Sequence, residues 1–373
     1  EERMRGLAAL ATAGLLAWPV AAQEVVRTVE SSAGPITVGE VTGGLVHPWG
    51  MDWLPDGRIV VTERPGRVRL VADGALSAPL GGSPEVWARG QGGMLDVRVD
   101  PDFADNRRLW LAFAEAGDGG ASTALGHGRL EDGRITGFET VFRMEPKVSG
   151  QAHFGSRILF AEDGSLFLTL AERYKFDPAQ DLSNHLGTIV RLQPDGSPHP
   201  DNPFLDREEA QPEIWSYGHR NIEAAALQPD TGELWIAEMG PRGGDELNHV
   251  ERGANYGWPE VSWGSHYNLM PIPDPPARPE FTDAVKQWTP VIAPSGMIFY
   301  TGELFPEWRG DAMIGGLVAE GITRLRLEGD AVVDEELIAL GERIREVAQG
   351  PDGAIYVLID RAEGAIWRLS PAG

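Results

Sequence analysis

The feature that most constrains the fold is a short phrase that returns six times along the chain. Each copy is a tight turn rich in Asp, Asn or Gly, followed by a run of β-branched and aromatic residues. The copies begin at Leu54, Asp100, Phe160, Leu227, Phe305 and Gln349. From Glu24 onward the chain shows no sustained helical periodicity. A strand-only unit that recurs at roughly this 60-residue spacing predicts a β-propeller.

The predicted architecture is therefore all-β, a single domain over residues 23–373 with six four-stranded antiparallel blades around a central channel. The segment PITVGEV, residues 35–41, precedes the first copy and is expected to form the outer strand of the last blade, closing the ring. A Pro-rich stretch at 264–288 separates the fourth and fifth copies and is predicted to be a long loop. Long loops inside compact domains usually carry function.

Composition excludes several classes of function. The formal net charge is −24, so the surface repels nucleic acid and anionic membranes. The sequence contains no cysteine, which excludes disulfides, thiolate nucleophiles and zinc–thiolate sites. The apolar run at 7–18, followed by Val20-Ala21-Ala22, predicts a signal peptide over residues 1–22, whose first three residues, ahead of Met4, are misassigned or non-native. We therefore expect an exported, periplasmic or secreted protein without a membrane span.

His153 is a candidate general base. It stands beside Phe154-Gly155-Ser156, just before a predicted β-hairpin, and Glu172 stands at the far end of that hairpin. A neutral imidazole held by a carboxylate is the usual arrangement of a general base near pH 7. A hydrogen-bonded structural histidine is the competing interpretation, and the residues alone leave both open.

Two further clusters indicate charged ligands. Arg343 and Arg345 alternate with Ile344 on a predicted strand, so both guanidinium groups face one side and repel unless an anion lies between them. With Arg220 on another blade, an anionic ligand in the channel is favoured over two ordinary surface arginines. The phrase GPRGGDEL, residues 240–247, offers backbone carbonyls, Asp245 and Glu246 as hard ligands for Ca²⁺, or it is simply a Gly-rich turn.

A serine hydrolase is disfavoured because the sequence lacks a G-x-S-x-G elbow. Taken together, a series of phrases in a fixed order resembles the soluble aldose sugar dehydrogenases that use pyrroloquinoline quinone (PQQ). They run from about His47 to Leu369 and include HPWGMDWLPDGRIVVTERPGR, GQGGMLDVRVDPDFADN, HFGSRILF, AQDLSNHLGTIVRLQPDG, WSYGHRN, GPRGGDELN, GANYGWP, IAPSGMIFYTGELFPEWRG and RIREVAQGPDGAIYVL.

The resemblance implies a periplasmic six-bladed propeller that oxidises aldoses at C1. His153 would remove the anomeric hydroxyl proton while the C1 hydride passes to PQQ, giving a lactone. By the matching motifs, the residues around the cofactor would be Gln91, Arg220, Asn221, Tyr267, Trp288, Arg343 and Arg345. The arginines suit PQQ because it carries three carboxylates. The electron acceptor is unidentified.

The resemblance also implies calcium. The carbonyls of Gly240 and Pro241 would bind the Ca²⁺ that contacts PQQ and polarises it as a Lewis acid. Glu246 and the carbonyl of Tyr256 look like ligands of a calcium site in the same region.

The chain departs from the family pattern at a few positions. LAER replaces the more usual LGDR, so Glu172 stands where the base-orienting Asp is expected, with one extra methylene. Val318 replaces a lysine that some relatives place near PQQ, and Met239 replaces a more polar residue. Two other functions stay open: a Ca²⁺-dependent propeller lactonase or esterase, and a non-catalytic propeller that binds sugar or protein. The arginines argue against the first, and His153 with the Arg343–Arg345 pair argues against the second.

Overall fold

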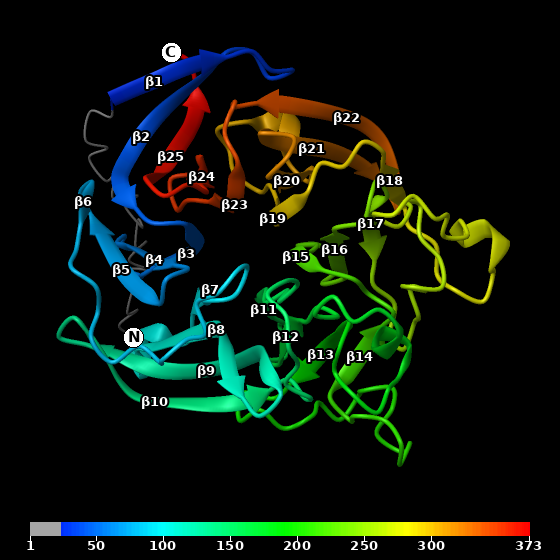
Figure 1. Cartoon of the computed structure of the whole chain (residues 1–373). Helices are drawn as coiled ribbons and strands as arrows, with labels where there is room; N and C mark the ends of the chain where they lie inside the picture. The colour runs from blue at the N-terminus through cyan, green and yellow to red at the C-terminus, as the bar shows by residue number, and fades with distance from the viewer. Residues whose placement is uncertain (1–23) are drawn as a thin grey trace, which may run out of the picture.

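The computed structural model describes residues 24–373, so the predicted signal peptide lies outside the described residues. Six antiparallel sheets form a ring (Figure 1). The first blade comprises β3 (Pro48–Trp53), β4 (Ile59–Glu63), β5 (Arg67–Ala72) and β6 (Ala75–Leu76). The second comprises β7 (Met94–Val99), β8 (Arg108–Gly117), β9 (Gly120–Glu131) and β10 (Arg134–Arg143). The third comprises β11 (Ile158–Phe160), β12 (Leu166–Thr169), β13 (Thr188–Leu192) and β14 (Ile214–Tyr217).

The remaining blades complete the predicted six. The fourth comprises β15 (Ile222–Leu227), β16 (Leu234–Glu238), β17 (Asp245–His249) and β18 (Lys286–Trp288). The fifth comprises β19 (Pro294–Phe299), β20 (Ala312–Gly316), β21 (Gly321–Glu328) and β22 (Ala331–Ala339). The last contains β23 (Ile344–Gln349), β24 (Ile355–Ile359), β25 (Gly364–Pro371), β2 (Ile36–Leu45) and β1 (Glu24–Val29). Helical turns are short: α1 (Phe103–Asn106), η1 (Asp177–Gln180), η2 (Pro275–Ala277) and η3 (Pro306–Trp308).

The N-terminal strand closes the ring, as the sequence predicts. β2 pairs antiparallel with β25, with Val38 opposite Leu369, so the two ends of the described chain share one blade (Figure 1). The last blade differs from the four-stranded expectation because β1 adds a fifth, largely exposed strand outside β2. The innermost strands β3, β7, β11, β15, β19 and β23 contact one another in sequence around the channel.

The hydrophobic core lies between blades rather than within them. One buried cluster, for example, joins Val60 and Leu70 of the first blade to Val97 and Leu111 of the second, and each of the other five interfaces has its own cluster. A blade therefore buries its apolar faces only against its neighbours, which makes closure of the ring a condition of stability.

The turn phrases form hairpins with the expected chemistry. Between β11 and β12, Oδ1 of Asp163 accepts hydrogen bonds from the backbone N–H and hydroxyl of Ser165 at 3.0 and 2.6 Å. Gly164 takes φ 82°, a left-handed conformation that favours glycine.

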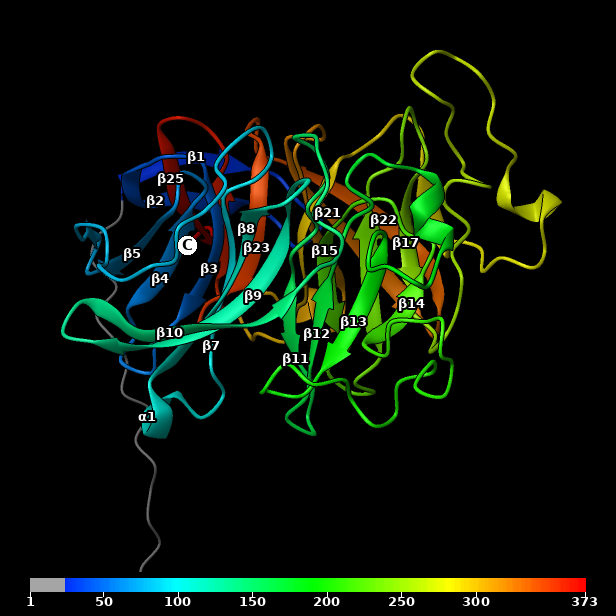
Figure 2. The same ribbon diagram turned by 60° about the horizontal axis from the view of Figure 1, so that its bottom comes forward.

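A long loop joins β17 to β18 and extends outward from the blades (Figure 2). The predicted loop ends slightly too late, because Lys286–Trp288 forms β18 and pairs with Asp245–Leu247. Within residues 24–373, no helix has the length and apolar character needed to cross a bilayer.

Candidate active site

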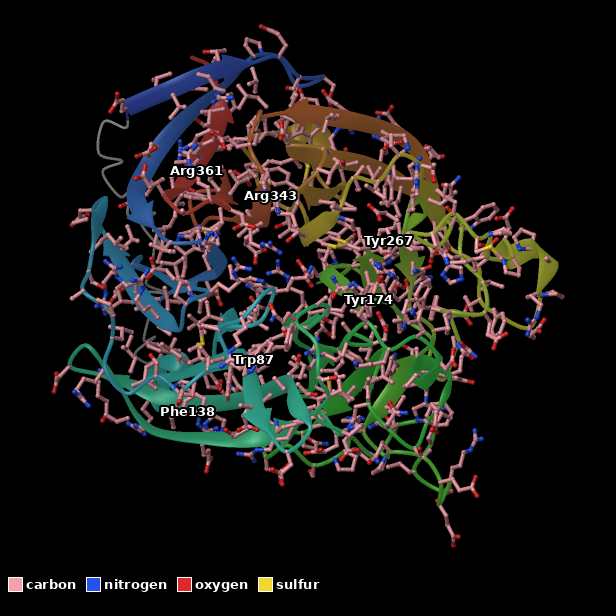
Figure 3. All side chains as sticks on the ribbon, viewed as in Figure 1. Trp87, Phe138, Tyr174, Tyr267, Arg343 and Arg361 are labelled. Atoms are coloured by element: carbon pink, nitrogen blue, oxygen red, sulfur yellow. The ribbon has the colours of Figure 1, made fainter. Side chains whose placement is uncertain are left out.

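The predicted site residues gather at one end of the channel because of where they stand in the blades. Gln91, His153, Asn221 and Arg343 each come shortly before the first strand of a blade. The innermost strands occupy equivalent positions in successive blades, so the segments that lead into them meet at the same face of the ring. Figure 3 shows Arg343, Tyr174 and Tyr267 near the centre of this face.

His153 and Glu172 form a buried pair. Nδ1 of His153 lies 2.5 Å from Oε1 of Glu172, and the His153 residue is only 6% exposed. The second carboxylate oxygen accepts the backbone N–H groups of Lys175 and Phe176, the latter at 2.7 Å. An ionised carboxylate only accepts hydrogen bonds, so a neutral ring carries its proton on Nδ1 and leaves Nε2 free to act as a base.

The environment keeps the imidazole neutral. Burial lowers the pKa of His153, and the positive charge of Arg220 acts in the same direction, while the hydrogen bond that His153 donates to Glu172 opposes both. Burial alone would raise the pKa of Glu172, but the hydrogen bonds with His153 and the backbone N–H of Phe176 outweigh it and the pKa is lowered. Near pH 7 the pair is therefore a neutral base beside a carboxylate anion.

Two side chains hold the His153 backbone in place. Oε1 of Gln91 accepts the His153 backbone N–H at 2.6 Å. Arg173 donates to the carbonyls of Ala152, Gly150 (2.9 Å) and His153 (3.3 Å). His153 has φ 57°, which is uncommon for a residue with a side chain. These contacts therefore stabilise a backbone conformation that the isolated segment would not favour.

A cavity of about 220 Å³ opens next to Gln91, which binds the His153 backbone, although neither His153 nor Glu172 is among its lining residues. It is lined by the polar residues His47, Arg64, Gln91, Glu223, Arg343, Arg345 and Asp360, with Trp49, Met239 and Leu317. The prediction that Arg343 and Arg345 face one side is confirmed, because both line this cavity. The structure also supplies the anion between them: Nη2 of Arg345 lies 2.6 Å and Nη2 of Arg343 lies 3.6 Å from Oδ2 of Asp360.

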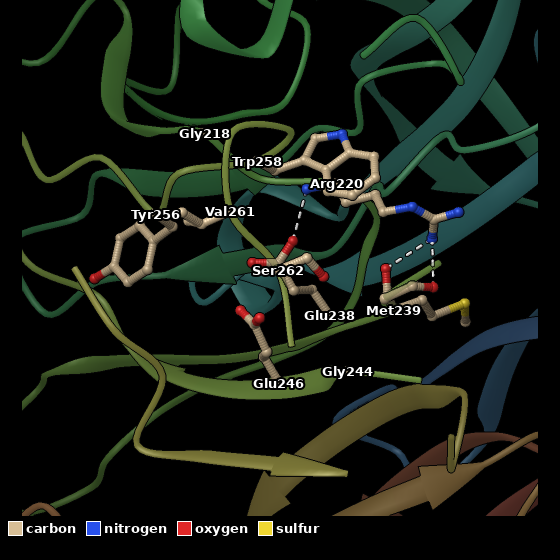
Figure 4. A pocket seen from close by; sticks show the side chains of 11 residues that line it. Gly218, Arg220, Glu238, Met239, Gly244, Glu246, Tyr256, Trp258, Val261 and Ser262 are labelled. Atoms are coloured by element: carbon tan, nitrogen blue, oxygen red, sulfur yellow. Dashed lines mark hydrogen bonds between the residues drawn. The ribbon is translucent and has the colours of Figure 1, made fainter. Parts of the chain in front are cut away.

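Arg220 and Asn221 connect this cavity to the GPRGG loop. Arg220 donates from Nη1 to the carbonyls of Met239 and Gly240, both at 2.8 Å (Figure 4). Asn221 is fully buried and donates to Glu223 at 3.1 Å, while its carbonyl oxygen accepts the Gly155 N–H at 3.3 Å. Asn221 thus ties the His153 loop to the fourth blade.

A second, much smaller cavity contains three of the four predicted metal residues: Gly240, Glu246 and Tyr256. Pro241 is not among its lining residues. Its volume of about 10 Å³ corresponds to one water-sized sphere. Burial and the neighbouring Glu238 carboxylate raise the pKa of Glu246 well above its ordinary value. The carboxylates of Glu238 and Glu246 thus lie close together around a space for one small sphere. A hard cation such as Ca²⁺ binds oxygen ligands of this kind and offsets their repulsion.

Two residues near this cavity, Asn248 and Asp245, differ in whether they leave an oxygen atom for a cation. Oδ1 of Asn248 is buried without a hydrogen-bond partner among the described residues, while its Nδ2 donates to Glu238 at 3.2 Å and Glu246 at 3.4 Å. Asp245, a candidate ligand in the Ca²⁺ interpretation of this segment, instead accepts the N–H groups of Gly240 and Ala293 at 2.8 and 2.7 Å. Burial raises the pKa of Asp245 to about 6.

The aromatic residues near the site differ in exposure: two tyrosines are exposed and one tryptophan is buried. Tyr267 is 58% exposed, and its hydroxyl accepts a hydrogen bond from Arg220 at 3.3 Å. Tyr174 packs edge-on against the His153 ring with centroids 5.3 Å apart and stays 43% exposed. Trp288 lies away from both cavities: it packs in the core between the fourth and fifth blades and donates to Glu335 at 2.7 Å.

The structure brings to the site several residues that the sequence did not predict: Arg64, Arg173, Tyr174, Glu223 and Asp360. Arg173 and Tyr174 directly follow Glu172, so proximity to the predicted carboxylate was an available signal. Arg64 and Asp360 come from the ends of β4 and β24, and the packing of the ring alone shows that they face the same cavity.

Comparison with known proteins gives consistent matches over almost the whole chain. The glucose/sorbosone dehydrogenase family model matches residues 45–368. The aldose sugar dehydrogenase of Escherichia coli is 44% identical over 352 residues, covering 91% of this chain and 94% of the relative. The apo crystal structure of the soluble Escherichia coli enzyme superposes with a TM-score of 0.86 at 43% identity, covering 90% of this chain and 100% of that chain.

A structure with bound cofactor also matches. The PQQ-bound aldose sugar dehydrogenase of Streptomyces coelicolor is 27% identical with a TM-score of 0.74, covering 95% of this chain and 100% of that chain. These matches define the chain as a propeller oxidoreductase of the sugar dehydrogenase class. It belongs to the glucose/sorbosone dehydrogenase family.

Proposed function

We propose that this protein oxidises aldose sugars at C1 to the lactone, with PQQ as electron acceptor and Ca²⁺ as a second cofactor. The observation that supports this most strongly is the buried His153–Glu172 pair next to a cavity lined by arginines. Gln91 joins the two, because it lines the cavity and accepts the backbone N–H of His153. The solved PQQ-bound structure of a relative 27% identical to this chain supports PQQ as the cofactor.

The base chemistry follows from the pair. Nε2 of His153 takes the proton of the C1 hydroxyl, and the imidazolium that forms is stabilised by the anionic Glu172 at Nδ1. Because His153 starts neutral, no proton has to leave it before the sugar binds. Glu172 holds the ring, and Gln91 and Arg173 hold the His153 backbone, so little reorganisation accompanies the transfer.

The residues proposed to hold the cofactors follow from the two cavities. Gln91, Arg343 and the other cavity-lining cations would hold PQQ, and the neighbouring Asn221 and Arg220 would contribute from the connection into the fourth blade. Glu246 and the carbonyls of Gly240, Pro241 and Tyr256 would provide oxygen ligands for Ca²⁺. When bound, PQQ accepts a hydride and Ca²⁺ polarises its reactive carbonyl.

The predicted signal segment and the resemblance support export to the periplasm or the exterior, with a separate, unidentified molecule as the final electron acceptor. The exposed Tyr267 and Tyr174 stand at the entrance to the base and suit a sugar ring, which commonly packs on aromatic faces.

Reconstitution tests the proposal. The apoprotein is supplied with PQQ, with Ca²⁺, and with both, and dye reduction is followed with glucose and several other aldoses. We expect turnover only with both cofactors and its loss in His153→Gln, while His249→Gln on the outer side of the fourth blade retains it. Failure of PQQ to bind, or lactone hydrolysis that needs Ca²⁺ alone, would overturn the proposal in favour of the binding or lactonase alternatives.

A further inference from the structure

A second histidine–carboxylate pair lies in the wall of the arginine-lined cavity. Nδ1 of His47 lies 3.0 Å from Oδ1 of Asp360, and both residues line the cavity. Burial opposes it, but the charge and hydrogen bond of Arg345 lower the pKa of Asp360 to about 2, so this carboxylate is ionised near pH 7. A neutral His47 ring therefore donates from Nδ1 and leaves Nε2 unprotonated. Within residues 24–373, Nε2 of His47 has no hydrogen-bond partner.

His47 repeats the construction of the His153–Glu172 pair. Each histidine stands in the segment that leads into the innermost strand of its blade, β3 for His47 and β11 for His153. Each has a carboxylate at Nδ1 and a left-handed backbone, with φ 46° and 57°. The His47 backbone is fixed on both sides, because its N–H donates to the Arg361 carbonyl at 2.9 Å and its carbonyl accepts the Arg64 N–H at 3.0 Å. Backbone of this kind is uncommon and concentrates at functional sites.

The two histidines differ in their access to solvent. The side chain of His153 is 7% exposed, whereas that of His47 is 35% exposed. His47 thus meets both the cavity and bulk water. Asp360 does not depend on His47 for a counter-ion, because it pairs with Arg345 at 2.6 Å and lies 3.6 Å from Arg343. Holding that carboxylate in place is therefore not a sufficient role for the imidazole.

The role assigned to His47 rests on the proposed function and on its proton balance. Oxidation of one aldose to the lactone yields two electrons and two protons. His153 takes the hydroxyl proton, and the C1 hydrogen leaves with both electrons as a hydride. An external acceptor that takes single electrons, such as a redox dye, removes the two electrons in two steps but takes no proton. The second proton is therefore released in the cavity and has to reach solvent.

His47 is the lining residue whose chemistry suits this transfer. The guanidinium groups of Arg64, Arg343 and Arg345 stay protonated in proteins, so they do not accept a proton. The carboxylate of Glu223 is bound by Arg345. Among the residues that line the cavity, His47 is the single imidazole, a group whose charge ordinarily changes between about pH 5 and 8.

We propose that His47 carries this second proton from the cavity to solvent while the reduced cofactor returns its electrons to the acceptor. Nε2 of His47 accepts the proton, and Asp360 stabilises the imidazolium at Nδ1. The Nε2–H bond then breaks to water, which restores the neutral ring. His153 thereby serves oxidation of the sugar, and His47 serves reoxidation of the cofactor.

Separate measurement of the two half-reactions tests this assignment. Stopped-flow absorbance follows reduction of bound PQQ by glucose, and then reoxidation of the reduced holoenzyme by ferricyanide, each with and without imidazole in the buffer. The variants are His47→Gln and His47→Asn, because asparagine tolerates the left-handed backbone. The control is His249→Gln, whose Nδ1 also faces a carboxylate, Asp330 at 3.3 Å, but which does not line the cavity.

Two further measurements do not depend on turnover. Equilibrium dialysis gives the Kd for PQQ, and thermal unfolding of each apoprotein shows whether the variant is folded. The Cε1–H resonance of His47, assigned by its loss in His47→Gln, is followed by NMR while PQQ is added to the Ca²⁺-loaded protein.

We expect both His47 variants to slow reoxidation by about tenfold or more, and to change the reduction rate and the Kd by less than about threefold. Imidazole should restore part of the lost reoxidation rate, because the exposed position of His47 lets it enter. The His47 resonance should shift when PQQ binds, and His249→Gln should behave as wild type.

An unchanged reoxidation rate in folded His47 variants, a loss that imidazole does not restore, or a resonance that PQQ does not shift would overturn the assignment. These outcomes are distinct from failure of the proposed function. If glucose does not reduce the wild-type holoenzyme, the proposed function fails, and the assignment fails with it.

Discussion

Glu172 holds both the candidate base and the loop that follows it, since one carboxylate oxygen lies 2.5 Å from Nδ1 of His153 and the other accepts the Phe176 N–H at 2.7 Å. The sequence comparison raised the question of whether a glutamate fits where the family pattern has an aspartate. In this structure the longer side chain spans both partners, so the extra methylene is used rather than merely tolerated.

Shortening or neutralising Glu172 should therefore impair catalysis in different ways. Glu172→Gln keeps the length but removes the charge that stabilises the imidazolium, and kcat should fall by roughly 10²- to 10³-fold. Glu172→Asp keeps the charge but cannot span both partners, and a misplaced base costs on the order of 10²-fold. Steady-state kinetics of reconstituted protein measure both. Unchanged kcat in Glu172→Gln would show that the carboxylate does not assist the base.

The pH dependence of kcat/KM should report His153. The base must be unprotonated, so activity is lost as the pH falls through its pKa. Because burial lowers that pKa, the acid limb should have its midpoint below the ordinary histidine value of about 6.5. Glu172 opposes this shift, so Glu172→Gln should move the midpoint lower still. A midpoint above 6.5 in wild type would contradict a neutral, desolvated base.

Arg173 is predicted to be a positioning residue. It packs 3.6 Å from the Phe154 ring and donates to the carbonyls of Gly150 and His153, and its burial lowers its pKa to about 10. Arg173→Lys keeps the charge but cannot reach the same set of carbonyls, so kcat should fall about tenfold or more with little change in the pH midpoint. An altered midpoint with normal kcat would mean that Arg173 acts on the His153 charge instead.

Asp360 should contribute to acid stability. Its folded pKa is lowered to about 2, with burial opposing the stronger attraction of Arg345 and Arg343. The resulting stabilisation, of order 2 kcal/mol, is present above the unfolded pKa near 4 and is lost as the pH falls from about 4 to 2. Asp360→Asn should lose it at every pH and cost about 3–5 kcal/mol near pH 7, because Arg345 loses a buried partner. Urea unfolding measures this, and a cost below about 0.5 kcal/mol would contradict it.

Because β2 closes the ring, two N-terminal truncations should differ sharply in thermal stability. Removing residues 24–29 takes away only the outer strand β1, and Tm should change by a few degrees at most. Removing residues 24–45 also deletes β2, exposes β25 and strips the buried Ile36, Val38 and Leu45 from the core. Each such side chain contributes about 1.5–3 kcal/mol, so this form should not fold. A cooperative thermal transition in the longer truncation would show that β2 is not needed for closure.

The sequence predicted those parts of the site that lie within one hairpin. His153 and Glu172 flank β11 and β12, and the antiparallel pairing of Ile158 with Leu168 brings the two ends of that hairpin together. The side shared by Arg343 and Arg345 was likewise a local property, because Arg343 directly precedes β23 and Arg345 is its second residue. The ring itself was predictable because its turn phrases repeat with the period of a blade.

Contacts between blades were not predictable in the same way. Arg64, Glu223 and Asp360 are single charged residues in unremarkable strand ends, and only packing around the channel places them in one cavity. Trp288 shows the opposite error. Its position in a matching motif placed it around the cofactor, but the indole packs between blades and donates to Glu335. The ion pairs of Arg345 with Glu223 and Asp360 join two blades, the fourth and the sixth, that lie far apart in the sequence.

The central claim is that His153 is the base in cofactor-dependent oxidation at C1. The most direct measurement is a stopped-flow record of PQQ reduction by glucose and by glucose deuterated at C1, in wild type and His153→Gln, each saturated with PQQ and Ca²⁺. The account predicts a slower rate with deuterium in wild type and a loss of roughly 10²- to 10⁴-fold in His153→Gln, with PQQ affinity retained. Equal reduction rates in the two proteins would contradict it.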